Sequence, residues 1–565
     1  RQTAPAKAPT GSHDRGLSRL ASQVLATRMP VGAGPAWLKP ELDTILAHDP
    51  HQMHGMAPAI DRLRQALRDR ERIFVVTDYD VDGTTSSLIL QAALHLAGGG
   101  AADLAWHIPD RFVEGYGFST QAADKAKELG AGLVVTADIG VRDHAAVSRA
   151  RNLGLDVLVC DHHLPADAEV PEDASAVLCP PQAGCSYPNP ALAACGVSLK
   201  VAQALLASHP RRDRLLRSFL KLAAIGTVAD VVDLSTDENR AIVALGLREL
   251  ASGRHSPGLS ALMDVAGLKD KRVLRASDLG FRIGPRINAA GRLEQATAVV
   301  ELLNERNPQR AQAMAQDLDR VNSERKGLQR LLEAEAKRQV SDPPPPFIVV
   351  WGEEKLDGSS PWHRGIAGIV AARLRDAFHR PAAVITVSGV SARGSIRSIP
   401  GFHAVHALDT ASDLLAGYGG HPAAAGFSVD AQHIPALAGR LQTWAATAGA
   451  GNHLPVHEFD ATARPGELSM QLFHELAELG PYGKGNPAPL LRIDGVLPED
   501  VGRMGQKGAH LRFRVGRERA VWWRAGDHAD ALMSGDRFDL LVRLEENEYR
   551  GRTNLQLVVE DARPS

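Results

Sequence analysis

Short apolar runs alternate with helical patterns through the first half of the chain. Four apolar residues at 73–76 precede a polar turn and the helical stretch LILQAALHL, and further apolar runs occur in GLVVTADIG (132–140) and LDVLVCDHHLP (155–165). Helical patterns separate these runs at about 121–129 and 144–153. Apolar strands that alternate with helices of about a dozen residues indicate a parallel, doubly wound α/β sheet.

The pattern changes towards the C-terminus. Residues 236–300 look helical, and residues 307–340 predict one long helix, with Asn307 as its cap and Pro308 at its first position. The run SDPPPP at 341–346 ends that helix. A second α/β pattern follows to about residue 448, and short strands between Gly-rich and polar turns fill residues 453–565. Several short strands in about a hundred residues favour a small barrel such as an OB-fold.

The predicted fold is therefore α/β, with a doubly wound parallel-sheet domain, a long linker helix, a second smaller α/β domain and a C-terminal OB-fold-like β-barrel. The length of 565 residues supports several domains rather than one. We place an N-terminal extension at 1–50, the parallel-sheet domain at 51–300, the linker helix at 301–345, the second α/β domain at 346–448 and the β domain at 449–565.

The composition excludes some classes of protein. Charged residues make up 23% of the chain and the formal net charge is −2, so nucleic-acid binding would need locally concentrated positive charge. No run of eighteen apolar residues occurs, which predicts no membrane span. The first sixteen residues lack an apolar core and do not resemble a secretory signal. The chain starts with Arg1 rather than Met, which leaves open whether residues precede it.

Cysteine usage points to a reducing compartment. The chain has four cysteines, none in a CxxC pair, which is typical of a cytoplasmic protein with buried or incidental thiols. A zinc site formed by Cys179, Cys185 and Cys195 is a less favoured alternative. The sequence therefore predicts cytoplasmic localisation.

Acidic and histidine side chains follow each of the predicted strands. Ligand sites in open parallel sheets form at the carboxyl ends of strands, so these residues are expected to converge although they are distant in sequence. An isolated DxDxD is equally compatible with a solvated acidic loop, and the later residues favour a site instead. The candidates are Asp78, Asp80 and Asp82, then Asp138, then Asp161, His162 and His163, and finally Asp230 in KLAAIGTVADVVDL, with Asp233 three positions later.

The types of ligand in this set favour magnesium or manganese. Carboxylate oxygens predominate, which suits Mg²⁺ or Mn²⁺ better than zinc, and the number of ligands suggests two ions. Two ions about 3.5–4 Å apart can activate a bridging water and hold the attacking and leaving oxygens of a phosphoester. A phosphoryl group is therefore the best-fitting substrate for the set of Asp78, Asp80, Asp82, Asp138, His162 and Asp230.

Arginines in small-residue settings offer places for phosphate. Arg282, Arg286 and Arg292 lie in LGFRIGPRINAAGRLEQA, and Arg397 lies beside Ser395 in GSIRS. The guanidinium fork can bind two phosphate oxygens while Gly and Ala permit close approach. Structural ion pairing of these arginines is the alternative.

Positive and aromatic side chains also gather in the predicted β domain. Such a combination suits single-stranded nucleic acid, which offers phosphates and unstacked bases, although a charged surface over an aromatic core would give the same pattern. The residues are Arg503, Lys507, Arg512, Arg514, Arg517, Arg519 and Arg524, with Phe513, Trp522 and Trp523 between them.

Taken together, these motifs resemble the DHH phosphoesterase superfamily. The triplet Asp161-His162-His163, with Asp80, Asp82 and Asp138, carries the first part of the resemblance. The stretches RFVEGYG, GTVAD, PRINAAGR and GGH, with the linker helix and the β domain, extend it. From about residue 35 onward the chain is similar to the superfamily's bacterial 5′→3′ exonucleases of single-stranded DNA.

The resemblance implies roles for the matching residues. Asp78, Asp80 and Asp138 would hold one ion, and the second would be held by Asp82, Asp138, His162 and Asp230. Asp161 is either a ligand or a group that orients His162. His163 would contact the scissile phosphate and stabilise the charge that develops there, so the catalytic residues would be His163, Asp138 and Asp161.

The resemblance also implies the DNA contacts and the partners. The terminal 5′ phosphate would be bound by Arg111, Ser395 and Arg397, and the DNA path would be lined by Arg286, Asn288, Arg325 and His421. A single-strand-binding protein and a RecQ-type helicase are the implied protein partners of a monomeric enzyme.

Three hypotheses of function result. The leading one is a 5′→3′ exonuclease that releases 5′-mononucleotides from single-stranded DNA with two Mn²⁺ or Mg²⁺ ions, in repair and recombination. A DHH enzyme acting on short oligonucleotides or cyclic dinucleotides is the second, and the long linker and β domain argue against it. The third is a non-catalytic DNA-binding scaffold, which the complete set of ligand residues opposes.

Overall fold

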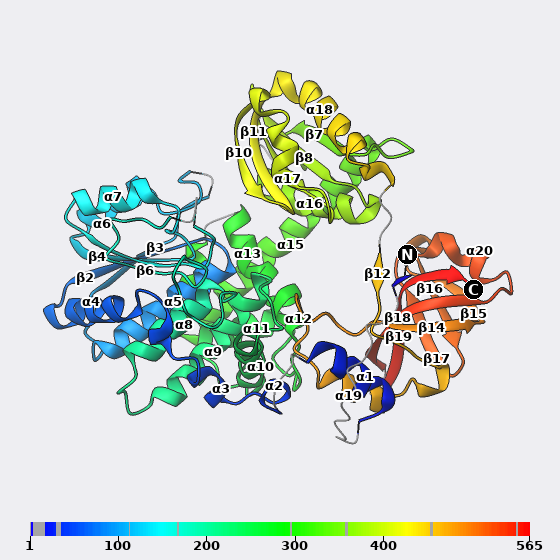
Figure 1. Ribbon diagram of the computed structural model, residues 1–565, viewed down its shortest axis with the longest axis horizontal. Helices are drawn as coiled ribbons and strands as arrows, with labels where there is room; N and C mark the ends of the chain where they lie inside the picture. The colour runs from blue at the N-terminus through cyan, green and yellow to red at the C-terminus, as the bar shows by residue number, and fades with distance from the viewer. Residues whose placement is uncertain are drawn as a thin grey trace. The chain divides into compact units, whose positions relative to one another are not determined.

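The chain folds into two compact units. The computed structural model describes residues 2–3, 17–29, 35–111, 113–165, 169–293, 296–355, 360–452, 456–549 and 552–565 (Figure 1). One unit contains residues 2–288, 296–315 and 457–565, and the other contains residues 289–295 and 316–456. Each of the two units combines parts of several of the five predicted domains, so the domain boundaries stay predictions.

A five-stranded parallel sheet forms the first part of the larger unit. Its strand order is β3-β2-β4-β5-β6 and every neighbouring pair is parallel. The elements are α4 (Met56–Asp69), β2 (Arg72–Thr77), α5 (Val81–Ala97), β3 (Leu104–His107), α6 (Thr120–Glu128), β4 (Ala131–Ala137), α7 (His144–Asn152), β5 (Asp156–Cys160), β6 (Ala176–Leu178) and α8 (Ala194–Leu205).

Helices cover both faces of this sheet. Alternate side chains of a strand point to opposite faces, and Val75 of β2 packs in the core with α4, α5 and α8, whereas Val76 packs in the core with α6 and α7. Figure 1 shows α6 and α7 on one side of the sheet and α4, α5 and α8 on the other. The predicted doubly wound parallel sheet is confirmed.

Further helices precede and follow this sheet along the chain. After the sheet come α9 (Arg212–Ala229), α10 (Asp237–Ala251), α11 (Pro257–Val265), α12 (Ala276–Asp278), a π-helical turn (Leu279–Ile283), α13 (Gly284–Leu293) and α14 (Thr297–Asn304), and residues 289–293 of α13 belong to the second unit. Near the N-terminus, α1 (Arg19–Arg28) packs in the core of the C-terminal sheet, as does Trp37 of α2 (Pro35–Leu38), while α3 (Leu42–Leu46) packs in the core of the parallel sheet. No helix in the described parts of the chain is both long and apolar enough to cross a membrane.

The predicted linker helix is α15 (Pro308–Gln339), a single helix of 32 residues. Asn307 caps it, because its Oδ1 accepts a hydrogen bond of 3.0 Å from the Arg310 backbone N–H. Leu318, Val321 and Leu332 of this helix are buried.

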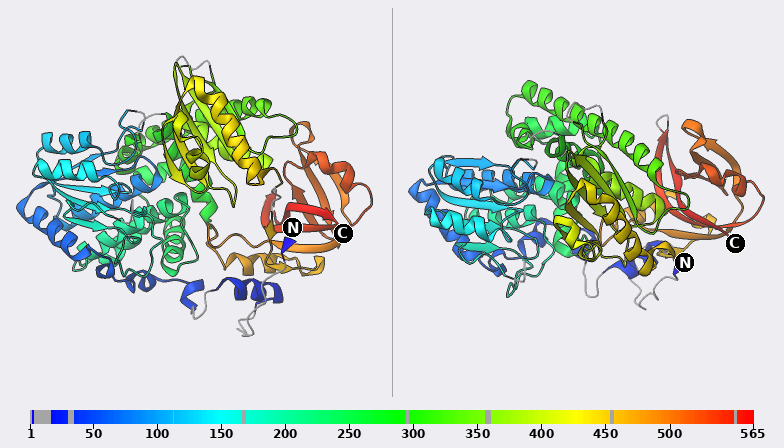
Figure 2. Two further views of the ribbon diagram at one scale, coloured as in Figure 1. Left: turned by 45° about the horizontal axis from the view of Figure 1, so that its top comes forward. Right: turned by 90° about the horizontal axis from the view of Figure 1, so that it is seen from above.

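The second α/β domain contains a mixed sheet of order β10-β11-β9-β8-β7, in which β7 and β8 are parallel and the other pairs antiparallel. Helix α16 and the last turns of α15 pack on one face, and α17 and α18 pack on the other (Figure 2). The bounds are β7 (Ile348–Glu353), α16 (Arg364–Phe378), β8 (Ala382–Ser388), β9 (Ser391–Arg397), α17 (Ala404–Asp409), β10 (Leu415–His421), β11 (Ala424–Asp430) and α18 (Ile434–Thr447).

The C-terminal part is a seven-stranded sheet of order β13-β14-β18-β19-β17-β16-β15. Its elements are β13 (Ala461–Thr462), α19 (Met470–Ala477), β14 (Leu491–Val496), β15 (Glu499–Met504), β16 (His510–Val515), β17 (Glu518–Trp522), α20 (Ala529–Leu532), β18 (Phe538–Tyr549) and β19 (Arg552–Pro564). A short strand β12 (His457–Glu458) pairs with β1 (Gln2–Thr3).

The expected closed barrel is corrected to an open sheet. Among the described residues, the two end strands, β13 and β15, do not pair with each other. Strand β13 has only two residues, and both pair with β14. A strand of that length offers too short a ladder to close the sheet against β15.

Candidate active site

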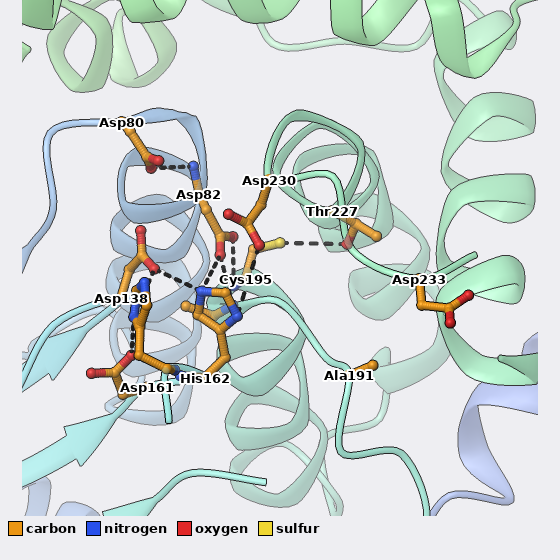
Figure 3. Close-up of polar contacts among 12 residues, drawn as sticks. Asp80, Asp82, Asp138, Asp161, His162, Ala191, Cys195, Thr227, Asp230 and Asp233 are labelled. Carbon is orange, nitrogen blue, oxygen red and sulfur yellow. Dashed lines mark hydrogen bonds and ion pairs between the residues drawn. The ribbon is translucent and has the colours of Figure 1, made fainter. Parts of the chain in front are cut away.

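The predicted acidic and histidine residues meet at the carboxyl edge of the parallel sheet. Figure 3 shows Asp80, Asp82, Asp138, His162 and Asp230 gathered in one cluster. They come from the ends of β2, β4 and β5, from the first turn of α5 and from the end of α9. Asp233 lies apart from the cluster (Figure 3), where its Oδ1 accepts a hydrogen bond of 2.8 Å from the Ser235 backbone N–H.

The turn after β2 is built to hold its aspartates in place. Asp80 is the N-cap of α5, and its Oδ1 accepts hydrogen bonds from the backbone N–H groups of Asp82 at 2.8 Å and Gly83 at 3.1 Å. A Cβ on Gly83 would lie 2.3 Å from the carbonyl oxygen of Asp78, so only glycine permits this close turn. The three alternating carboxylates are therefore fixed by the backbone rather than splayed into water.

Asp82 is held by the start of another helix. Its side chain is fully buried, and its two oxygens accept hydrogen bonds from the backbone N–H groups of Ala194 at 2.7 Å and Cys195 at 2.9 Å. These groups begin α8, whose N-terminal end carries a partial positive charge. The contact joins residues 112 positions apart and fixes the carboxylate beside the cluster.

Three groups of side chains in the cluster have ligand atoms within 4.8 Å of one another. They are Asp78, Asp80 and Asp138; Asp82, His162 and Asp230; and Asp138, His162 and His163. His162 Nε2 lies 3.2 Å from Asp138 Oδ1 and 3.9 Å from Asp82 Oδ2, and His162 Nδ1 lies 3.8 Å from Asp230 Oδ2. The structure thus brings together both predicted ligand sets, with Asp138 between them.

The cluster has the features of a divalent-cation site. Asp78 Oδ1 is buried and has no hydrogen-bond partner among the described residues, and the buried His162 Nε2 lies close to Asp138 Oδ1 without forming a well-oriented hydrogen bond. Unpaired buried polar atoms are costly, and a cation between these side chains would satisfy both. The remaining donors are carboxylate oxygens, which Mg²⁺ and Mn²⁺ prefer. The residues therefore fit such ions, and no cysteine belongs to any ligand group among the described residues.

Burial and mutual repulsion disfavour charge on the clustered carboxylates. Burial raises the pKa of Asp138 well above its usual range, and the charges of Asp80, Asp82 and Asp78 raise it further. Burial, followed by Asp82 and Asp80, raises the pKa of Asp230 to about 8. Burial and the charge of Asp80 also raise the pKa of Asp78. Groups that repel one another this strongly are typical of functional sites that bind cations.

The two histidines differ in their protonation. Burial lowers the pKa of His162, which favours the neutral form that can bind a metal. Burial also opposes charge on His163, but the hydrogen bond and the charge of Asp161 outweigh it and raise the pKa of His163. His163 therefore binds a proton more readily than His162 does.

Asp161 contacts His163 through its side chain. Its Oδ1 accepts hydrogen bonds from His163 Nδ1 at 2.8 Å and from the backbone N–H groups of His162 at 2.7 Å and His163 at 3.2 Å. Its Oδ2 accepts a hydrogen bond from the backbone N–H of Val141 at 3.0 Å. The carboxylate thus orients the His163 ring, whereas only the backbone of His162 donates to it.

Sequence reasoning missed two tyrosines beside the cluster. The Tyr116 hydroxyl lies 3.4 Å from His163 Nε2 and 3.5 Å from the Asp138 carbonyl oxygen. The Tyr79 ring meets Tyr116 edge-on, and the Arg111 guanidinium lies 4.7 Å from the centre of the Tyr79 ring. The available signal was the position of Tyr79 between two of the aspartates and of Tyr116 within RFVEGYG.

The other candidates in the larger unit have structural contacts of their own. Arg286 donates hydrogen bonds to the carbonyl oxygens of Arg282 at 2.7 Å and Val265 at 2.9 Å. Asn288 is half-buried in α13. On β16 and β17, Arg512 and Arg519 are exposed, as are Arg517 and Trp523 in the adjoining turns. Phe513 instead belongs to the core of this sheet, and Trp522 stacks on His528.

The remaining candidates belong to the second unit. Arg325 of α15 is buried and donates from Nε at 3.3 Å and Nη2 at 3.2 Å to Asn322 Oδ1. Arg397 of β9 donates from Nη1 to Ser395 Oγ at 3.1 Å, which places the predicted phosphate pair side by side. His421 is exposed at the end of β10.

The chain is similar to known domains and proteins along most of its length. The DHH family N-terminal domain matches residues 72–227, the DHHA1 domain residues 348–447 and the RecJ OB domain residues 459–561. The single-stranded-DNA-specific exonuclease RecJ of Bacillus subtilis is 36% identical over an alignment of 529 residues, which covers 91% of this chain and 64% of that protein. The chain thus spans less than two thirds of the length of that relative.

A second relative matches over nearly its whole length. The single-stranded-DNA-specific exonuclease RecJ of Salmonella typhimurium is 34% identical over an alignment of 553 residues, which covers 91% of each chain. The crystal structure of RecJ in complex with Mn²⁺ from Thermus thermophilus has a TM-score of 0.81 and 31% identity, covering 97% of this chain and 76% of that one. With these similarities and the three matched domains in order, the chain belongs to the RecJ family.

Proposed function

We propose that this protein is a metal-dependent exonuclease that removes 5′-mononucleotides from the 5′ end of single-stranded DNA. The observation that carries the proposal is the cluster of carboxylates and His162 at the edge of the parallel sheet, with unpaired buried ligand atoms among the described residues. Membership of a family whose named relatives are single-stranded-DNA-specific exonucleases supports DNA as the substrate. A role in repair and recombination fits this activity.

The ligand residues are proposed to hold two ions, Mn²⁺ or Mg²⁺. Bound divalent ions supply a water of lowered pKa and neutralise charge on the phosphate. Asp138 serves both positions because its carboxylate belongs to the group with Asp78 and Asp80 and also lies 3.2 Å from His162.

His163 is proposed to stabilise the phosphate during cleavage. Its Nδ1–H donates to Asp161, and protonation leaves an N–H at Nε2, next to the Tyr116 hydroxyl. A fixed donor that faces developing negative charge stabilises the transition state without reorganising. Asp161 contributes by holding the ring in this orientation and by favouring its charged form.

The phosphate and DNA contacts are proposed separately for each unit. In the larger unit, Arg111 beside the cluster binds phosphate, and Arg286 and Asn288 line the DNA path. In the second unit, the adjacent Ser395 and Arg397 bind phosphate, and Arg325 and His421 contact the strand. Arginine paired with a hydroxyl suits a terminal phosphate, which carries more negative charge than an internal one.

A direct experiment tests the proposed reaction. Single strands labelled at the 5′ end should release mononucleotides in the presence of Mn²⁺, and Asp138→Ala should abolish the release. Strands with a 5′ hydroxyl should react more slowly than phosphorylated strands, and Arg397→Ala should remove this preference. Shortening of the strand from the 3′ end would reject the polarity, and comparable turnover of a dinucleotide would favour a small-substrate enzyme.

We also infer partners and location from the family resemblance. A single-strand-binding protein and a RecQ-type helicase would act together with a monomeric enzyme in the cytoplasm. Light scattering of the purified chain tests the monomer. Co-purification with each tagged partner, in the presence of nuclease that removes bridging DNA, tests the two interactions.

A further inference from the structure

The chain makes a strained turn directly after Asp230. Asp230 caps the C-terminal end of α9, where its backbone N–H donates to the Gly226 carbonyl oxygen at 2.9 Å. The next residue, Val231, has a φ of 58° and is 57% exposed. A β-branched residue in the left-handed region is strained and persists only where the surrounding structure enforces it.

A loop from the C-terminal part enforces the chain direction after this turn. Residues 479–486, called the brace here, lie between α19 and β14. The Leu234 backbone N–H donates to the Lys484 carbonyl oxygen at 2.8 Å. From the other side, Arg240 Nη2 donates to the carbonyl oxygens of Leu479 at 2.8 Å and Gly480 at 2.5 Å. Arg240 is fully buried, so these contacts are shielded from water.

The backbone of the brace lies against the side chains of Asp233 and Leu234 in the turn. Gly485 has a φ of +76°, and a Cβ built on it would lie 1.8 Å from Asp233 Oδ1. A Cβ on Gly483 would lie 2.7 Å from Leu234 Cδ1. Two glycines thus allow the brace to lie directly on the residues that follow Val231.

The brace is itself rigid. Asn486 is buried, and its Nδ2 donates to the carbonyl oxygens of Leu479 at 3.0 Å and Pro481 at 2.9 Å, which closes the loop on itself. Arg28 of α1 donates to Asn486 Oδ1 at 3.1 Å and bonds Asp460 through two nitrogens at 2.8 Å. The brace therefore connects the C-terminal part to the turn through a chain of hydrogen bonds.

We propose that the brace, residues 479–486, positions Asp230 for metal binding, so that the C-terminal part is a structural component of the metal centre. The inference rests on the proposed function, because it assigns Asp230 as a ligand. Its positioning residues are Gly485, Lys484 and Arg240, which lie outside the three ligand groups found among the described residues.

The test is Mn²⁺ binding to the full-length protein without DNA, measured by titration calorimetry. Gly485→Ala adds a methyl group where the Asp233 carboxylate lies, at a position with a φ of +76°, so either the brace must shift or Asp233 must give up its hydrogen bond to the Ser235 backbone N–H in the turn. Gly535→Ala is the matched control, since Gly535 has a φ of +85° and open space around its Cβ position. We expect Gly485→Ala to weaken one Mn²⁺ site by on the order of 10-fold or more, and Gly535→Ala to bind as the wild type does.

A second variant covers the case in which Gly485→Ala does not fold. Asn486→Ala loosens the brace without adding any atom, and it should weaken the same site in the same direction. Equal Mn²⁺ affinity in the folded brace variant and in Gly535→Ala would overturn the proposed brace. A wild-type protein that binds no Mn²⁺ at all would instead refute the proposed metal centre.

Discussion

Asp138 is the residue on which most of the cluster depends, and its backbone is unusual. It has a φ of 64° and is buried in the middle of the ligand groups. Asparagine adopts this left-handed conformation more readily than most residues, so Asp138→Asn should keep the fold while removing the charge. We expect cleavage of labelled single strands to fall by at least about 100-fold.

The same variant makes a second, opposite prediction for stability. Without metal, the charge of Asp138 is disfavoured by burial and by the surrounding carboxylates. Asp138→Asn should therefore melt at a higher temperature than the wild type in a chelator, but gain less from added Mn²⁺. A lower melting temperature in the chelator would show that the carboxylate stabilises the metal-free fold.

Asp230 predicts how the stability of the metal-free protein depends on pH. Its pKa is about 8 in the folded chain and about 3.9 in an unfolded one. Between these values the folded state binds the extra proton, so the stability falls as the pH rises from about 4 to about 8. Mn²⁺ needs the ionised carboxylate, so the stabilisation that it provides should increase over the same range.

Melting temperatures at several pH values, with chelator and with Mn²⁺, measure this effect. Asp230→Asn should make both curves less steep between about pH 4 and about pH 8, because it removes one of the titrating carboxyl groups. If the wild type and this variant show the same pH dependence, another group of the cluster is responsible.

The clustering of the predicted ligand residues could be inferred from the sequence, but their orientations could not. Acids that follow apolar strands indicated the edge of the sheet at which they meet. The contact of Asp161 with His163, and the hydroxyl of Tyr116 beside that ring, depend on side-chain directions that no spacing encodes. Likewise, Asp82 receives its hydrogen bonds from residues 112 and 113 positions away.

At the scale of elements, the sequence pattern predicted the helices and strands that depend on contacts between nearby residues. The alternating strands and helices and the long helix α15 follow from periodicity and from signals such as Asn307 and Pro308. The open edge of the C-terminal sheet was missed because strand pairing is non-local. The close packing of α9 on α5 is equally hidden: a Cβ on Gly226 would lie 2.4 Å from Thr85 Oγ1, a contact that helps bring Asp230 near Asp82.

Helix α15 allows a prediction at this scale. Gly327 lies in its interior, and a methyl group added there would have open space around it. Gly327→Ala should therefore stabilise the fold by about 0.5–1 kcal/mol, because alanine loses less conformational freedom in a helix. Urea unfolding measures the gain. Exonuclease activity should stay at the wild-type level, and a loss would show that the reaction uses local bending of α15.

At the scale of the whole molecule, the charge distribution limits where the proposed DNA substrate can bind. The formal net charge is −2, so the attraction for DNA must come from local groups such as the exposed Arg512, Arg517 and Arg519 on the C-terminal sheet. Each phosphate contact on a single strand contributes about 0.7 to the slope of log affinity against log salt concentration. Replacing all three with alanine should reduce that slope by about 2.

Fluorescence anisotropy with a labelled single strand in the chelator measures the slope without cleavage. The control replaces Arg68, Arg211 and Arg214, which are equally exposed but lie on α4 and at the start of α9, and it removes the same total charge. Because only charges that touch phosphate release counterions, the control should shift the affinity slightly and leave the slope unchanged. Equal slopes for the two triple variants would mean that the C-terminal sheet does not contact the DNA backbone.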